Sequence, residues 1–414
     1  MRRARQGGLK INYVLMKPIE LRTPAAYASL YYVSAFCNYS VVFMESSSNR
    51  AETDCRPTIN LEDFPSTRYQ GSKRKILPWI HTILQPIDFH TALDLFGGTG
   101  SVSYLLKKLG KSVTYNDALH FNYLIGQALI ENESVLLSRE DIHNLLSPSV
   151  VREYSFVAET FKGIYFSNAE NQWIDAMCMK ISKLGASLEG EFKAALAYYA
   201  LFQACLAKRP FNLFHRKNLY LRHACVERTF GNKATWDRPF SNHFKQFAQE
   251  ANRLVFKGQA KCRAMNHDAS EFPNADFDLV YLDPPYLRKQ GSHETADYRR
   301  CYHFLEGIAN YDEWHSLVDL ETANRRLKIQ ETNIWCDRKK CSQAFDELFG
   351  RFPKSTIVIS YRKGGVPSLS TIVRLLRRHR RLVHVHTRHY KYALNHQNGD
   401  AKFNREALIV GMKA

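Results

Sequence analysis

The sequence predicts an α/β fold with an open sheet, and three observations indicate it. Residues 91–96 form an apolar strand that is followed by a glycine-rich loop and by a helix over residues 101–109. Residues 277–282 form another short apolar run, of the kind that makes a buried strand. Between them, residues 119–265 are largely helical and include an apolar-periodic helix over 189–207. Further strands are predicted over 112–116, 354–361, 382–387 and 407–410, with a helix over 369–378.

Charge and length restrict the classes of function. The 414 residues can bury one large core or two modest ones. The chain has 58 Lys and Arg against 40 Asp and Glu, a net charge of +18. This excess favours a polyanionic partner, nucleic acid above all, although a basic protein without such a partner is the alternative. Nine scattered cysteines without a Cys-x-x-Cys pair predict reduced thiols in a cytoplasmic protein, and no metal site is predicted.

Residues 1–60 differ from the rest of the chain. The start is basic, and residues 23–44 carry no charge, which is just enough length to span a bilayer. Because this run contains Pro24, Asn38 and several serines, we predict no membrane span. We expect residues 1–60 to be a poorly ordered extension, and a reading frame that truly starts at Met44 is one explanation for it.

Two acidic residues flank the glycine-rich loop. Asp94 lies at the end of the first strand, before Gly97-Gly98-Thr99-Gly100, and Asp117 follows the second strand. The loop exposes backbone amides at a helix N-terminus, but Ser103 stands where a dinucleotide fingerprint needs its third glycine. Asp117 is spaced to hold ribose hydroxyls, and Asp94 can hold an ammonium group. An ammonium and a ribose without a pyrophosphate fit S-adenosylmethionine better than NAD.

Two further segments are candidates for the same ligand site. Gly71, within the basic stretch 67–75, lets the backbone approach a ligand closely, although a basic helix cap explains the stretch nearly as well. Asp268 precedes the central strand and can accept a hydrogen bond from an adenine amino group. A plain helix N-cap is the alternative for Asp268.

The tetrapeptide Asp283-Pro284-Pro285-Tyr286 ends the central strand. Two prolines prevent both a continuing strand and a helix, so the loop is stiff and lies where open α/β sheets bind ligands. A carboxylate from Asp283 and the backbone carbonyl of Pro284 can accept both hydrogens of an aromatic amine, which frees its lone pair to react. Tyr286 offers a flat face to a base that has left its stack. An ordinary Pro-Pro turn is the alternative.

Cations, amides and aromatic residues alternate over residues 208–222. Such side chains contact phosphates, base edges and base faces, so this segment is a candidate nucleic-acid surface. A solvated basic loop packed by its own aromatic residues is the alternative. The candidate DNA contacts are Arg209, Asn212, His215, Arg216, Asn218 and Arg222.

Taken together, residues 66–412 resemble the D12 class of adenine-specific DNA methyltransferases, which includes the Dam-type enzymes. The individual motifs are short, and their order and spacing make the resemblance specific. The residues that carry it are Tyr69-Gln-Gly-Ser-Lys73, Asp94-Leu-Phe-Gly-Gly-Thr-Gly100, Asp117, Asp283-Pro-Pro-Tyr286, Tyr302-His-Phe-Leu-Glu-Gly307 and Ser360-Tyr361, with Arg209 to Arg216 as a further likeness.

This resemblance implies a seven-stranded, mostly parallel methyltransferase sheet. It divides the chain into a catalytic domain over 66–130 and 255–414 and a helical target-recognition insertion over 131–254. It also implies contacts to S-adenosylmethionine from Tyr69, Gly71, Lys73, Asp94, Phe96, Gly98, Gly100, Asp117 and Asp268, with catalysis by Asp283, Pro284, Pro285 and Tyr286.

We therefore predict methyl transfer to the N6 amine of a flipped adenine in double-stranded DNA, in a restriction-modification or a solitary methylation system. Any restriction endonuclease is expected on a separate chain. Cytosine N4 methylation needs the same amine chemistry and is the first alternative. A DNA-binding regulator on an inactive scaffold is the second, and the sequence indicates no oligomeric state.

Overall fold

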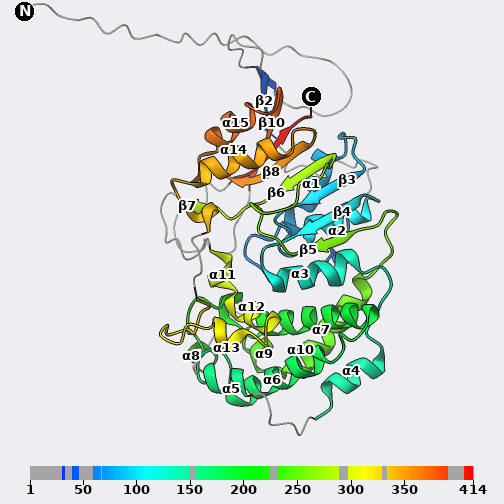
Figure 1. Cartoon of the computed structure of the whole chain (residues 1–414), viewed down its shortest axis with the longest axis vertical. Coiled ribbons are helices and arrows are strands. Elements are labelled where there is room, and N and C mark those ends of the chain that lie inside the picture. The colour runs from blue at the N-terminus through cyan, green and yellow to red at the C-terminus, as the bar shows by residue number, and fades with distance from the viewer. Residues whose placement is uncertain are drawn as a thin grey trace, which may run out of the picture.

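A nine-stranded sheet forms the upper part of the molecule in Figure 1, and a body of helices lies below it. This computed structural model describes residues 30–32, 40–45, 59–66, 68–148, 155–223, 232–288, 297–328, 333–389 and 405–413. The strand order is β1-β2-β10-β11-β8-β6-β3-β4-β5. The strands at its centre are β3 (Thr91–Asp94), β4 (Ser112–Asn116), β5 (Arg263–Met265), β6 (Leu279–Leu282), β8 (Thr356–Arg362), β10 (Leu382–His389) and β11 (Arg405–Gly411).

These seven strands confirm the predicted mostly parallel sheet. The neighbours β5, β4, β3, β6 and β8 all run parallel to one another. By contrast, β11 inserts antiparallel between β8 and β10. The parallel strands place their carboxyl ends at one edge, where the loops after them can share a ligand.

Two short strands extend the sheet beyond the predicted seven. These are β1 (Leu30–Tyr32) and β2 (Ser40–Glu45), which pair antiparallel, and β2 pairs parallel with β10. They fall within residues 1–60, which we expected to be a poorly ordered extension, so for these segments the structure differs from the expectation. Pairing with β2 gives β10 hydrogen-bond partners along what would otherwise be an exposed edge. Most of residues 1–58 lie outside the described part of the chain.

Side chains along the central strands alternate between two hydrophobic cores. Ala92 and Tyr281 face one core with the helices α1 (Leu77–Leu84), α2 (Ser101–Lys108) and α3 (His120–Gly126). Leu93 and Val280 face the other core with α14 (Cys341–Arg351) and α15 (Leu369–Leu376). Because both faces of the sheet are covered, the strands are apolar on both sides, and this is why they appear in the sequence as continuous apolar runs.

The helical body is organised around α7 (Leu188–Ala207), which confirms the helix predicted over 189–207. Residues 195–207 of α7 are almost all buried, as expected for a helix that is packed on every side. Around α7 lie α4 (Arg139–Leu146), α5 (Phe156–Thr160), α6 (Asn168–Ser182), α8 (Tyr220–His223), α9 (Asn232–Asp237) and α10 (Phe240–Leu254). None of the helices in the described part of the chain is both long and apolar enough to cross a membrane.

A second segment of chain joins this helical body. It contains α11 (Tyr298–Cys301), α12 (His303–Ala309) and α13 (Trp314–Leu317), which come after the central strand in sequence. Phe304 stacks on Phe214 with ring centroids 5.0 Å apart, and Trp314 lies 4.9 Å from Phe161. The helical body is thus built from two stretches of chain, whereas the sequence placed all of residues 255–414 with the sheet.

Candidate active site

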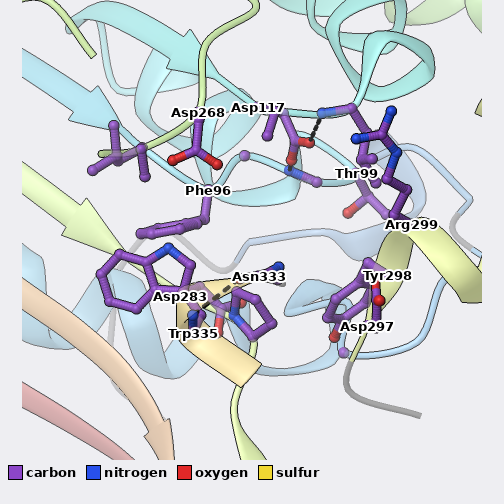
Figure 2. A pocket seen from close by; sticks show the side chains of 18 of the residues that line it. Phe96, Thr99, Asp117, Asp268, Asp283, Asp297, Tyr298, Arg299, Asn333 and Trp335 are labelled. Carbon is purple, nitrogen blue, oxygen red and sulfur yellow. Dashed lines mark hydrogen bonds between the residues drawn. The ribbon is translucent and has the colours of Figure 1, made fainter. Parts of the chain in front are cut away.

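A cavity of about 520 Å³ opens at the carboxyl ends of β3, β4 and β6. In Figure 2, Asp117 and Asp268 lie along one side and Asp283 on the opposite side. Phe96 and Trp335 close one end. Ten of the thirteen predicted catalytic and cofactor residues line this cavity, namely Tyr69, Gly71, Lys73, Asp94, Phe96, Gly98, Asp117, Asp268, Asp283 and Pro285.

The glycine-rich loop turns sharply between β3 and α2. Gly98 and Gly100 have φ values of +51° and +69°, a region that favours glycine. The amide of Gly97 donates to the carbonyl of Asn116 at 2.8 Å, which fixes the loop to the end of β4. Gly98 faces the cavity, but Gly100 caps α2 and does not line it. Gly100 therefore serves the turn, and its predicted contact to a cofactor stays a prediction.

Asp94 is a buried carboxylate with one oxygen available. Its side chain is 1% exposed, and one oxygen accepts a hydrogen bond from the Ser103 hydroxyl at 2.7 Å. The other oxygen has no hydrogen-bond partner among the described residues. Burial raises the pKa of Asp94 to about 7, because the charged form has lost its water. A buried carboxylate with an available oxygen is suited to a cationic ligand, which fits the ammonium group expected from the sequence.

Asp117 and Asp268 occupy the neighbouring strand ends. Asp117 accepts from the amides of Gly98 at 2.9 Å and Leu119 at 2.8 Å, so backbone groups fix its orientation in the cavity wall. Burial raises its pKa to about 6, against the effect of these hydrogen bonds. Asp268 is exposed and accepts from the Ser270 amide at 2.8 Å, which makes it the cap of a turn as well as a lining residue.

Asp283 is paired with a lysine from a distant part of the chain. The Lys73 ammonium lies 2.7 and 2.8 Å from the two carboxylate oxygens of Asp283 and 3.5 Å from Glu406. Burial raises the pKa of Asp283 to about 6, and the nearby Lys73 ammonium opposes this rise. Lys73 was predicted to contact the cofactor, but its ammonium is directed at Asp283. The sequence could not reveal this pair, because the two residues are 210 positions apart.

Two residues of the Asp-Pro-Pro-Tyr loop lie outside the cavity lining. Pro284 is buried, and the ring of Tyr286 lies 5.1 Å from that of Tyr361 in the core beside α14 and α15. The Tyr286 ring therefore packs on Tyr361, and its predicted contact with a flipped base stays a prediction. Asp283 and Pro285 do line the cavity.

An aromatic stack that the sequence analysis missed closes the other end of the cavity. Tyr298 lies parallel to Tyr69 at 5.3 Å, and Tyr69 lies parallel to Tyr302 at 4.4 Å. Gly71, with φ +85°, leaves room for Tyr298, because a Cβ at Gly71 would lie 2.7 Å from its hydroxyl oxygen. Gly71 therefore accommodates a tyrosine, and not only a ligand as predicted. The i, i+4 spacing of Tyr298 and Tyr302 was the available signal.

Trp335 was also missed. Its indole contacts Phe96 edge to face, with ring centroids 5.2 Å apart, at the end of the cavity opposite Tyr298. The residue lies in a short 3-10 helix, Ile334–Cys336, outside every motif that the sequence displayed.

The predicted nucleic-acid segment divides into inward and outward side chains. Arg209 is 1% exposed; it donates to the Leu213 carbonyl and to the side chain of Asn218, and its guanidinium lies over the Tyr165 ring. Arg222 pairs with Glu170 at 2.7 Å. These three side chains are largely buried and bind partners within the protein, which argues against the direct DNA contacts predicted for Arg209, Asn218 and Arg222.

The outward side chains of the same segment form a surface. Arg216 and Lys217 are exposed, and Asn212 and His215 are partly exposed. Phe211 and Tyr220 are 67% and 68% exposed, unusual for large aromatic residues. The amide of Phe214 donates to the Cys301 carbonyl at 2.8 Å, so this surface is joined directly to α11, which begins at the cavity.

The strand order and the acidic cavity define an α/β protein with a candidate ligand site at the carboxyl ends of its parallel strands. Residues 69–312, more than half of the chain, match the family model described as D12 class N6 adenine-specific DNA methyltransferase. The chain therefore belongs to this family, and the predicted adenine-specific DNA methyltransferase activity is confirmed.

Curated relatives agree with this assignment. The type II methyltransferase M2.HphI of Haemophilus parahaemolyticus is 25% identical over 359 residues, which cover 85% of this chain and 99% of that protein. M.NlaIII of Neisseria lactamica is 25% identical over 337 residues, 75% of this chain and 87% of that protein. M.FokI of Planomicrobium okeanokoites is 26% identical over 338 residues, and this chain spans only 47% of its length.

Proposed function

We propose that the cavity binds S-adenosylmethionine beside an adenine that has been swung out of duplex DNA. The observation that most supports this is that Asp94, with its unpartnered oxygen, and Asp283 line the same cavity of about 520 Å³. That volume lies within the range of ordinary ligand sites. Asp94 is buried and Asp283 is partly buried, so both carboxylates interact with a ligand more strongly than they would in bulk water.

The cofactor half of the proposal assigns one role to each acidic residue. Asp94 holds the ammonium group, Asp117 the ribose hydroxyls and Asp268 the adenine amino group, while Phe96 and Trp335 supply an apolar wall. S-adenosylmethionine, when bound, supplies a methyl group that a positively charged sulfur makes electrophilic.

Asp283 acts on the target amine. Its carboxylate accepts one N–H hydrogen, and the Pro284 carbonyl, which belongs to the adjacent residue but is not in the cavity lining of this structure, accepts the other in the proposed complex. The two acceptors localise the lone pair on nitrogen. With a pKa of about 6, Asp283 is mostly ionised at neutral pH and is a suitable acceptor for the proton that N6 loses. Below pH 6 the carboxyl is protonated, so activity falls as the pH is lowered through this value.

The helical body recognises the target in this proposal, with residues 131–254 and 297–328 facing the duplex. Arg216 and Lys217 contact phosphates, and the net charge of +18 steers the anionic duplex. Several relatives are named type II methyltransferases or modification methylases. We extend this to a cytoplasmic enzyme of a restriction-modification system, whose endonuclease is a separate chain.

Transfer of a tritiated methyl group from S-adenosylmethionine to genomic DNA tests the proposal. Asp283→Ala should bind the donor normally and lose methyl transfer at least about 100-fold, because the acceptor for the amine is gone. Asp276→Ala, at an exposed ion pair with Lys354, is the matched control and should behave as the native enzyme. Native-like transfer by Asp283→Ala, or label found outside N6-methyladenine, would refute the assignment.

A further inference from the structure

Glu406 is a buried carboxylate that the proposed mechanism does not use. It lies on β11, two strands from the Asp283 loop, and is 1% exposed. The Ser360 hydroxyl donates to it at 2.9 Å, and the Lys73 ammonium lies 3.5 Å away. Burial of an ionisable side chain in a sheet is costly unless its neighbours compensate, so its position next to Lys73 needs an explanation.

The position of the Lys73 ammonium weakens Asp283 as a hydrogen-bond acceptor for the target amine. Its ammonium contacts both oxygens of Asp283, at 2.7 and 2.8 Å, and the Gly71 carbonyl at 3.2 Å. Each oxygen of a carboxylate keeps a second lone pair, but the ammonium draws negative charge from both oxygens, so Asp283 is a weaker acceptor for an incoming amine than it would be without this contact. Asp283 becomes a stronger acceptor for the target amine when Lys73 gives up part of this contact.

We infer that Glu406 is a positioning residue, a second carboxylate that holds the Lys73 ammonium so that Asp283 becomes a stronger acceptor for the target amine. The inference rests on the proposed function of Asp283. The distance of 3.5 Å means that Lys73 needs to shift by only a fraction of an ångström to form a close ion pair with Glu406. The ammonium therefore stays paired and buried throughout, and no unpaired charge is created.

The surrounding charges favour such sharing. The groups that face Asp283 are Lys73, Glu406 and Asp94, with the phenols of Tyr281, Tyr286 and Tyr298. Lys73 is the one cation among these described neighbours, and the two carboxylates of Asp283 and Glu406 lie beside it. If the Glu406 charge is removed, Lys73 interacts with Asp283 alone, which lowers the pKa of Asp283 and makes it a poorer acceptor.

Glu406→Gln tests the inference, because an amide retains the shape and can still accept from Ser360. Steady-state kinetics with duplex DNA should show kcat reduced about tenfold, while KM for both substrates stays within about twofold. The acid limb of the pH profile of kcat should move to lower pH, since loss of the Glu406 charge lowers the pKa of Asp283. A merely structural role for Glu406 would not move this limb.

Glu250→Gln is the matched control, since Glu250 lies in α10 and accepts from Ser66 and Tyr199, away from the cavity lining. Its acid limb should coincide with that of the native enzyme. If Glu406→Gln does not fold, Glu406→Asp retains the charge but withdraws it from Lys73, and its kcat should fall below the native value.

Three outcomes would overturn the inference. These are a native kcat in Glu406→Gln, a lowered kcat with an unmoved acid limb, or a native kcat in Glu406→Asp. Failure of the proposed function is distinguishable, because the native enzyme itself would then transfer no methyl group to adenine.

Discussion

Substitution of Asp94 by asparagine should stabilise the ligand-free enzyme at high pH while weakening its binding of the methyl donor. The buried carboxyl has a pKa raised from 3.8 to about 7. Below about pH 4 it is protonated in both the folded and the unfolded chain, so its full contribution to stability is present there. As the pH rises to about 7, the Asp94 carboxyl ionises readily only in the unfolded chain, and its contribution to the stability of the folded chain is lost.

The size of the effect follows from the shift. At about 1.4 kcal/mol per pKa unit, the full rise corresponds to roughly 4 kcal/mol, and solvent relaxation reduces this to about 2–4 kcal/mol. Asparagine carries no charge, and its carbonyl can still accept from Ser103. The free energy of unfolding of Asp94→Asn relative to the native enzyme should therefore improve by about 2–4 kcal/mol between pH 4 and pH 8.

Urea unfolding of the ligand-free proteins at both pH values measures this difference, and calorimetric titration with S-adenosylmethionine measures binding. Binding should weaken about 100-fold, because a charge-assisted hydrogen bond is lost. Asp278→Asn is the control; the Asp278 carboxylate accepts from the amides of His90 and Thr91, which lowers its pKa, so this variant should lose stability at pH 8 relative to pH 4. The reasoning would be refuted if the difference in unfolding free energy between Asp94→Asn and the native enzyme did not change with pH. It would also be refuted if the variant bound S-adenosylmethionine with native affinity.

Two further predictions concern the helical body and the tyrosine stack. Arg209→Ala should cost about 2–4 kcal/mol of unfolding free energy, because it removes a buried guanidinium that holds several acceptors, as a urea titration would show. Arg216→Ala should leave stability unchanged and reduce the salt dependence of DNA binding by about one counterion. Equal effects of the two variants on stability would contradict the assignment of Arg209 to the interior and Arg216 to the surface. Gly71→Ala should destabilise the enzyme by about 1–3 kcal/mol, owing to its φ of +85° and the 2.7 Å approach to Tyr298. Tyr298→Phe should recover part of that loss in a double-mutant cycle, and strict additivity would show that the two residues do not interact.

Local sequence was sufficient to place the acidic residues of the cavity. Asp94, Asp117 and Asp283 each stand at or directly after the end of a predicted strand, and the chain places all three at one edge of the sheet. This works because parallel strands with connecting helices have their carboxyl ends on the same side. The spacing of these residues and the stiff Pro-Pro loop also identified the family without any coordinates.

The sequence did not predict whether a charged side chain points into the protein or toward solvent. Arg209 and Arg216 stand in one basic aromatic segment, yet one is buried and the other exposed. A guanidinium can either reach solvent or bind carbonyls that the folded loop directs inward, and composition is the same in both cases.

The sequence by itself therefore determined the sheet, the acidic strand ends and the chemistry of the Asp283 loop. Only the tertiary structure decided which groups act on that loop, since Lys73 and Glu406 approach Asp283 from positions far away in the chain. The contact of Tyr298 with Gly71 and the pairing of β2 with β10 also join segments that are far apart in the sequence. Contacts between distant segments depend on how whole layers pack, and short patterns of residues carry no information about that packing.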